Sequence, residues 1–162
     1  MNTIKVVVLS IFILIPNSLF SQNWYIEGYT EEDAKNYFSY RDIDPIEGIW
    51  QSSDGYRYAI EKDVERGRRV NNKYRIVVIV GGYSEWKLGH IKGFLSYGSD
   101  DGYYSMIYYT RAIGSGYYAN NTTSSQSLLL FFDGKNKASF SYRNNDYYGT
   151  QKEITWVKIY PR

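Results

Sequence analysis

The sequence predicts an all-β protein, an antiparallel up-and-down β-barrel of about eight strands with one short N-terminal helix. From Ile46 onward, apolar and polar side chains alternate with a period of two, and turn-forming residues separate these runs at short intervals. The chain also holds 19 tyrosines and 4 tryptophans, and aromatic residues favour strands. A β-sandwich is the alternative. We favour the barrel because consecutive strands joined by short turns close into a meander, and closure removes exposed strand edges.

The first residues have the organisation of a secretory signal peptide. Lys5 precedes a short apolar run, Pro16 interrupts it, and the small residue Ser21 stands before Gln22. The run is too short to span a bilayer comfortably, and an uncleaved membrane anchor is the alternative interpretation. We therefore expect residues 1–21 to be removed near Ser21/Gln22 and the protein to be exported, either periplasmic or secreted.

The remaining chain is expected to contain an N-terminal segment, 22–45, and one barrel domain, 46–162. Because the chain has no cysteine, disulfides, thiolate metal sites and the lipid anchor of bacterial lipoproteins are excluded. The formal net charge is only +2, which does not favour a nucleic-acid partner. No stable membrane anchor is expected.

The expected helix begins just after Thr30. This residue is a good N-cap, and the three acidic residues that follow it suit the positive end of the helix dipole. Ala34, Tyr37 and Phe38 then share one face at helical spacing. Pro45 is expected to mark its end, because the residue before proline avoids helical geometry.

Seven strands are expected with a clear pattern and one or two with a weaker one. The expected strands lie in the segments 46–51, 56–61, 74–80, 90–97, 104–108, 128–132, 137–143 and 153–160, and the Gly/Ser/Asn-rich stretch 114–125 contains one weak strand at best. In the last segment, Thr155, Val157 and Ile159 share the charge-free parity and are expected to face the core. Trp156 and Tyr160 are then expected to face outward.

Gly48-Ile49-Trp50 resembles the Gly-x-Trp signature of lipocalins and related calycin barrels. The resemblance implies that the tryptophan closes the barrel floor and that a basic residue near the last strand packs across it. Lys158 or Arg162 would have that role here. The central Thr-Asp-Tyr motif of the family is missing, so an ordinary core tryptophan in an unrelated β fold is the alternative.

A wider resemblance covers most of residues 40–162. The stretch 44–50, followed by Trp86-Lys87 and the terminal 158–161, is similar to an exported bacterial domain that sometimes accompanies trypsin-like protease domains. This resemblance implies an accessory module without an assigned activity, and it transfers no functional residue.

No familiar catalytic equipment is present. His90 is the single histidine. It alternates in step with Lys92, so it is predicted to lie on the polar face of its strand. No sequence motif for a catalytic nucleophile accompanies it. One histidine without cysteine does not form a typical zinc site. Paired carboxylates are conceivable for glycoside hydrolysis, but the candidates lie on parities that look solvated: Glu47, Glu61, Glu85 and Glu153. We expect no enzymatic activity, no metal and no cofactor.

The leading functional hypothesis is a non-catalytic, lipocalin-like binding module for a small apolar or aromatic ligand. Phenols and apolar rings together suit a ligand that has one polar end. The interior is expected to be lined by Trp50, Tyr58, Tyr104, Met106, Tyr108 and Phe140. The same residues are compatible with a solidly packed core, because barrels of this size are often filled.

The alternative function is an exported interaction or accessory domain with a filled core. Such a domain would bind a glycan or a partner protein through exposed aromatic side chains. The candidates for this surface patch are Trp86, Trp156 and Tyr160.

Overall fold

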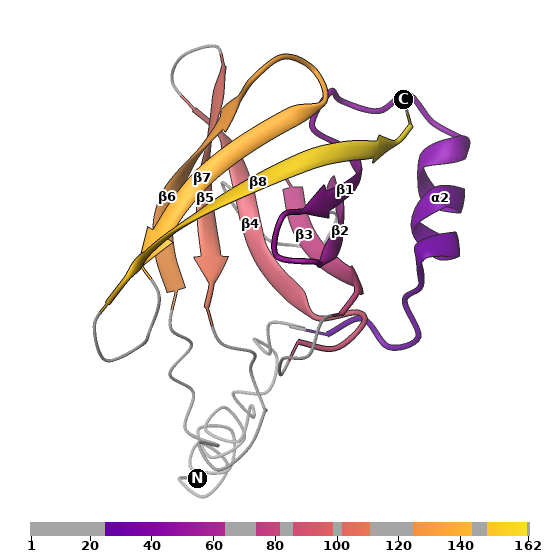
Figure 1. The fold of residues 1–162 in the computed structure, drawn as a ribbon. Coiled ribbons are helices and arrows are strands. Elements are labelled where there is room, and N and C mark those ends of the chain that lie inside the picture. Colours follow the sequence, from indigo (N-terminus) through magenta and orange to yellow (C-terminus); the bar gives the residue numbers. More distant parts are fainter. Residues whose placement is uncertain are drawn as a thin grey trace, which may run out of the picture.

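The computed structural model confirms the predicted fold class. Eight antiparallel strands pair in chain order, and β8 pairs back with β1 to close the barrel (Figure 1). The structure describes residues 25–63, 74–81, 86–98, 102–110, 125–143 and 149–161. Since the sheet is closed, the alternative sandwich is excluded.

The elements follow one another as a simple meander behind one helix. They are α2 (Glu31–Ser39), β1 (Gly48–Ser52), β2 (Arg57–Lys62), β3 (Tyr74–Val80), β4 (Ile91–Tyr97), β5 (Tyr103–Tyr109), β6 (Ser125–Phe132), β7 (Lys137–Arg143) and β8 (Gln151–Tyr160). No helix in these described stretches is long and apolar enough to cross a membrane.

Helix α2 begins with the predicted cap. The Thr30 side chain accepts a hydrogen bond from the Asp33 N–H at 3.2 Å, and the Asp33 carboxylate accepts one from the Thr30 N–H at 2.8 Å, which forms a capping box. The helix ends at Ser39, earlier than Pro45 predicts. The Ser39 hydroxyl donates to the Lys35 carbonyl at 2.7 Å, so it satisfies one carbonyl of the last turn.

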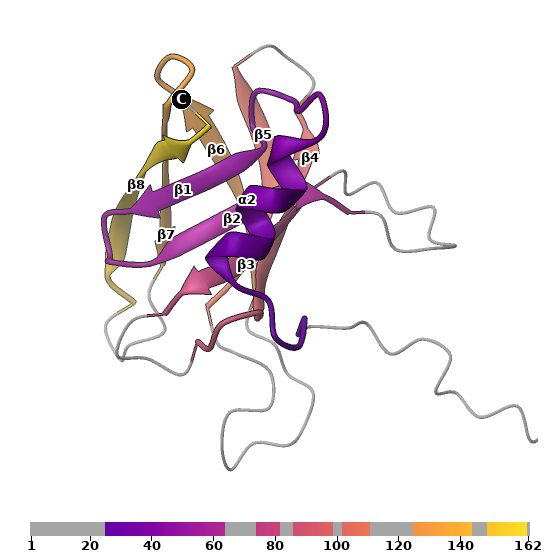
Figure 2. The ribbon, with the colours of Figure 1, turned by 90° about the vertical axis from the view of Figure 1, so that its right-hand side faces the viewer.

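The helix lies on the outside of the barrel, across β1, β2 and β3 (Figure 2). Ala34 and Phe38 face the sheet and bury the outward side chains of three strands, Ile49, Ala59 and Val77. This second, smaller core explains why the first strands are apolar on both faces. It also closes the outer surface of β1–β3 to ligands.

The main core fills the barrel interior. We call the end where β1 begins the floor, which contains Ile46, Trp50 and Lys158. We call the opposite end the rim, where Asp54 lies in the turn between β1 and β2 and Tyr108 lies near the end of β5. Buried side chains from all eight strands form one hydrophobic cluster between these ends.

The parity predicted for β8 is wrong. Trp156 is fully buried in the main core, whereas Val157 is 47% exposed. The prediction placed the face without charges inside, but Lys158 also points inward. Its Nζ donates to the Pro45 carbonyl at the floor, at 2.9 Å. A lysine can bury its aliphatic part while its ammonium reaches a polar partner. The presence of Lys158 among alternate residues of β8 therefore did not mean that those residues face outward.

The orientation predicted for Lys92 is also wrong. Ile76 pairs with Gly93, but the next residue of β3, Val77, pairs with Ile91. Lys92 is therefore the extra residue of a β-bulge, and a bulge re-aims the side chains around it. Lys92 is only 5% exposed, and its ammonium lies against the ring of Tyr108, an interior residue.

The wall of the barrel is incomplete between β6 and β7. Each of these strands forms seven residue pairs with its other neighbour, but they share only two pairs with each other, Phe131 with Ser139 and Phe132 with Ala138. We call the unpaired stretch toward the rim the seam. At its far end the side-chain amide of Gln126 hydrogen-bonds both backbone groups of Arg143 and replaces the missing ladder.

Candidate functional site

Trp50 and Lys158 lie close together at the floor. The Trp50 indole N–H donates to the Ile46 carbonyl at 2.9 Å, and Lys158 Nζ lies 5.8 Å from the centroid of the Trp50 ring. Burial lowers the pKa of Lys158, and Glu47 partly offsets this effect. Arg162, the other candidate, lies outside the described residues.

Polar groups near the floor find partners. The Tyr74 hydroxyl is 2.7 Å from the Asp44 carboxylate and 2.6 Å from the Tyr97 hydroxyl. Burial and these two hydrogen bonds raise the pKa of Tyr74 well above its ordinary value. Lys62 also forms an ion pair with Asp44 at 3.2 Å. These polar groups at the floor are therefore paired with one another.

The rim half of the interior is built from contacting aromatic rings. The Tyr58 and Trp156 centroids lie 5.3 Å apart, and those of Phe140 and Trp156 5.1 Å apart. Tyr108 lies 5.0 Å from Phe140 and 5.4 Å from Tyr142. These are the separations at which aromatic side chains attract one another.

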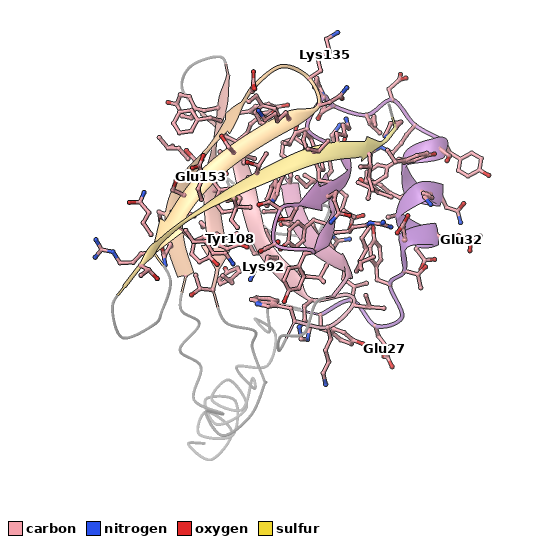
Figure 3. The ribbon with its side chains drawn as sticks, in the orientation of Figure 1. Glu27, Glu32, Lys92, Tyr108, Lys135 and Glu153 are labelled. Carbon is pink, nitrogen blue, oxygen red and sulfur yellow. The ribbon has the colours of Figure 1, made fainter. Side chains whose placement is uncertain are left out.

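Lys92 places a cation among the rings at the rim. Its Nζ lies 3.6 Å from the centroid of the Trp86 ring and 4.7 Å from that of Tyr108. Figure 3 shows Lys92 and Tyr108 close together in the half of the barrel opposite the end of β8. Both distances are within the range of cation–π attraction, which is stronger in a desolvated site.

Four buried polar atoms near the rim have no hydrogen-bond partner within the described part of the chain. We call them the rim polar set: Ser52 Oγ, Asp54 Oδ1, Tyr58 OH and Trp156 Nε1. Ser52 and Trp156 are register partners on β1 and β8, and Trp156 contacts the Tyr58 ring. Unsatisfied buried polar groups are rare in native structures, and each requires an explanation.

The electrostatics connect Asp54 to the buried phenols. Burial raises the pKa of Tyr58 well above its ordinary value, and Tyr108 and then Asp54 add to this effect. Burial and then Asp54 likewise raise the pKa of Tyr108. The two phenols thus influence each other, although the Tyr58 hydroxyl has no partner in good hydrogen-bond geometry. Both remain neutral donors and acceptors at physiological pH.

All six predicted lining residues point into the barrel, but at different depths. Tyr58, Tyr108 and Phe140 belong to the rim half, whereas Tyr104 packs near the floor, where it and Trp50 both contact Phe132. Met106 is buried in the same cluster. Their rings pack on neighbouring rings instead of facing one another across a shared space, so the six residues do not form one pocket.

The predicted aromatic surface patch is not formed. Trp156 is inside the barrel, and Trp86 is only 6% exposed. Tyr160 is partly buried and its hydroxyl lies 2.9 Å from that of Ser39 on α2. The prediction fails for Trp156 because the inward and outward positions of β8 are the reverse of those expected. It fails for Trp86 because a residue outside a regular strand has no alternation from which its burial can be inferred.

The expectation that the four candidate carboxylates are solvated is wrong for two of them. Glu47 and Glu61 are buried, not solvated, because α2 and the segment after it cover the outer face of the first strands. Glu61 accepts hydrogen bonds from Tyr29 at 2.6 Å and from Arg75 at 2.6 Å, and Glu47 pairs with Arg41 at 3.1 Å. Neither carboxylate faces open space.

The remaining candidates from the sequence are Glu85, Glu153 and His90. Glu153 is exposed, and Glu85 lies outside the described residues. His90 Nδ1 accepts a hydrogen bond from the Lys87 N–H at 3.1 Å. Within the described stretches, no three histidine, cysteine or acidic side chains converge in a way that would hold a metal ion.

Two shallow hollows lie on the seam. One, of about 370 Å³, is lined by Gln126, Tyr142 and Gln151 among others. The second, of about 390 Å³, is lined by Leu128, Phe140 and neighbouring residues. Because Phe140 and Tyr142 also contact the Tyr108 ring, the seam brings surface hollows next to the rim half of the interior.

Sequence reasoning missed several residues of this site. Lys92, Ser52 and Asp54 were not proposed, since a bulge and an unsatisfied atom depend on register and have no local pattern. Trp156 would have been found if the last strand had been assigned by its largest apolar side chains rather than by its charges. Comparisons with family models, with curated proteins and with solved structures gave no match for this chain.

Proposed function

We propose that this protein is an exported, non-catalytic binding module that takes a small apolar or aromatic ligand at the rim of its barrel. One observation supports this most strongly. Among the described residues, polar side chains at the floor such as Tyr74, Asp44 and Lys158 are paired, whereas four buried polar atoms in the rim half have no partner and lie beside contacting rings. Leaving a buried donor or acceptor unpaired costs about 1–3 kcal/mol, so an occupant that supplies the missing partners is stabilised there.

Binding would combine two kinds of contact. The faces of Tyr58, Tyr108 and Phe140 offer apolar area, and the rim polar set orients a polar end. This function needs no catalytic side chain. The barrel holds the rings in place, and α2 closes the outside of β1–β3.

The first test is whether the purified protein holds or takes up a small apolar molecule. Native mass spectrometry detects a co-purifying ligand, and titration with an apolar fluorophore measures uptake. Two tyrosines on the inner face of β5 provide matched variants. Tyr108→Leu at the rim is expected to weaken fluorophore binding about tenfold, which corresponds to losing roughly 1.4 kcal/mol of contact, whereas Tyr104→Leu near the floor leaves the affinity unchanged.

If neither native mass spectrometry nor the fluorophore titration detects a bound molecule, the binding module is ruled out. Equal loss of affinity in the two variants would mean that the fluorophore reports general loosening of the core. Thermal unfolding of both variants, measured in parallel, separates these effects because both substitutions remove a similar ring.

A second function, docking of a partner through the outer surface, is favoured by a separate observation. On the outer face of β6, Leu129 and Phe131 are about half exposed, and Phe131 contacts Tyr103 on β5. A hollow of about 330 Å³ lies beside them, lined by Phe94 and Ile107 among others. Phe131→Ser is expected to abolish binding to a polysaccharide or partner protein without changing the melting temperature, if this surface is used.

Export is part of the same proposal. The basic start, the apolar run and the small residue before Gln22 support cleavage by a signal peptidase. N-terminal sequencing of the protein from the periplasm or the medium is expected to give a chain that starts near Gln22. A chain of full length that stays with the membrane fraction would contradict export by cleavage.

A further inference from the structure

The rim polar set determines which hydrogen-bonding groups an occupant must carry. An indole N–H such as that of Trp156 only donates, and an ionised carboxylate such as that of Asp54 only accepts. The hydroxyls of Ser52 and Tyr58 do either. An occupant that satisfies all four atoms therefore needs at least one acceptor and at least one donor. A hydrocarbon has neither, and a carboxylate group has no donor.

The charges around the rim favour a neutral occupant. Burial disfavours a charged group among the rings of Tyr58 and Tyr108, as it disfavours their own phenolates, and Asp54 adds repulsion of a negative charge. A cation is disfavoured for the opposite reason. The ammonium of Lys92 is already held against the rings of Trp86 and Tyr108, where a second positive charge would be close to it.

Two of the four atoms belong to side chains that pack among aromatic rings, Tyr58 and Trp156. Trp156 lies between Tyr58 and Phe140, with centroids 5.3 and 5.1 Å away. Rings of this kind contact another ring better than a flexible chain, since edge and face contacts between aromatic groups add to simple burial. A hydroxyl group supplies the donor and the acceptor together, without a charge.

We propose that the rim polar set binds a small neutral aromatic compound that carries a phenolic hydroxyl. This inference rests on the proposed function and gives the chemical class of its ligand. The hydroxyl of the ligand donates to Asp54 and accepts from the Trp156 indole and the Tyr58 hydroxyl, and its ring packs against the aromatic side chains of the rim.

Three probes of similar size test the class: phenol, toluene and benzoate. Nitrogen-edited NMR spectra of the intact protein resolve the tryptophan indole N–H signals, and Trp156→Phe assigns the signal of Trp156. Phenol is expected to shift this signal and to leave that of Trp50 in place, because the Trp50 N–H already donates to Ile46. Phenol is expected to bind about tenfold more tightly than toluene, and benzoate more weakly than either.

A pair of isosteric variants tests the role of the polar set. Tyr58→Phe removes an unpartnered hydroxyl and is expected to weaken phenol binding about fivefold with little effect on toluene. Tyr74→Phe removes a hydroxyl that is paired at the floor, and it is expected to leave both affinities unchanged. Both substitutions keep the ring, so the fold is retained.

The outcomes separate this inference from the proposed function. Equal affinity for phenol and toluene, with Tyr58→Phe silent, would overturn the phenolic class while the binding module stands. A crystal structure with ordered waters on all four atoms, together with no response to any probe, would overturn the inference as well. The fluorophore titration then decides the proposed function independently.

Discussion

Gly48 shows how a single residue determines the construction of the floor. It has a φ of +141°, and a Cβ atom placed there would lie 2.4 Å from the Tyr160 carbonyl oxygen and 2.6 Å from Cε of Lys158. Glycine is therefore required at position 48 for two reasons. Its backbone conformation is strained for other residues, and the Lys158 side chain occupies the space of a Cβ atom. The same close approach lets Lys158 reach both the Pro45 carbonyl and the Trp50 ring.

Gly48→Ala is expected to destabilise the protein by about 3 kcal/mol or more, because backbone strain and a steric overlap add together. Gly55→Ala is the matched control. Gly55 also has a positive φ, +92°, but a Cβ atom there meets nothing within 4 Å. Only the strain, about 1–2 kcal/mol, is expected for the control. Urea unfolding measures both, and equal losses would mean that Lys158 does not constrain this glycine.

At the scale of single residues, the sequence predicted inward positions well where ring size and parity agreed. Tyr58, Tyr108 and Phe140 are inside the barrel as predicted. It failed at Lys92 and Trp156. At Lys92, a β-bulge turns the side chain inward although the amino-acid pattern of the strand is unchanged. Near Trp156, the inward Lys158 makes the core face of β8 look polar in the sequence. Both errors arise because side-chain chemistry was used to infer orientation where tertiary contacts determine it.

The element that differs most from an ideal barrel is the β6–β7 pair. Neither strand is short, since β6 has 8 residues and β7 has 7, yet they share two register pairs. Gln126 bridges them at the rim end of the seam, accepting from the Arg143 N–H at 2.9 Å and donating to its carbonyl. A side-chain amide thus occupies the place of a backbone amide and limits how far the seam opens.

Gln126→Ala is expected to open the seam. The loss of two hydrogen bonds to Arg143 should cost about 1–2 kcal/mol of stability and increase hydrogen exchange at the Arg143 amide. Gln126→Glu keeps the acceptor for that amide, so its exchange should rise less. Gln151→Ala, an exposed neighbour on β8 that lines the same hollow, is the control and should change neither quantity. Unchanged exchange in Gln126→Ala would show that the seam is closed by other contacts.

At the scale of elements, the meander and its turns were predictable because period and turn chemistry are local. The sequence also predicted the start of α2, since a capping box is a local motif. It did not predict the position of the helix on the outside of β1–β3, which buries Glu47 and Glu61. It did not predict the seam either, because the alternation in β6 and β7 looks the same whether or not the strands pair.

At the scale of the whole molecule, folding of the barrel keeps several buried phenols protonated. Burial is the largest cause that raises the pKa of Tyr104 and of Tyr109 to about 12, and burial raises the pKa of Tyr58 and Tyr108 still further. In the unfolded chain the pKa of each returns to ~10. Each folded-state pKa is above its unfolded value, so this contribution to stability is fully present below pH ~10 and is lost as the pH rises.

The free energy of unfolding is therefore expected to be nearly constant between about pH 7 and pH 9 and to fall steeply above about pH 10. Each fully buried phenol adds a slope of about 1.4 kcal/mol per pH unit, because the unfolded chain releases a proton that the folded chain keeps. Urea unfolding at closely spaced pH values measures this slope, and absorbance of tyrosinate shows when the rings ionise. Tyr58→Phe removes one buried phenol and should reduce the slope by that amount, whereas Tyr40→Phe, at a position 88% exposed, should not. Tyrosines that all ionise near pH 10 before the protein unfolds would contradict a dry aromatic interior and, with it, a rim whose polar atoms need an occupant.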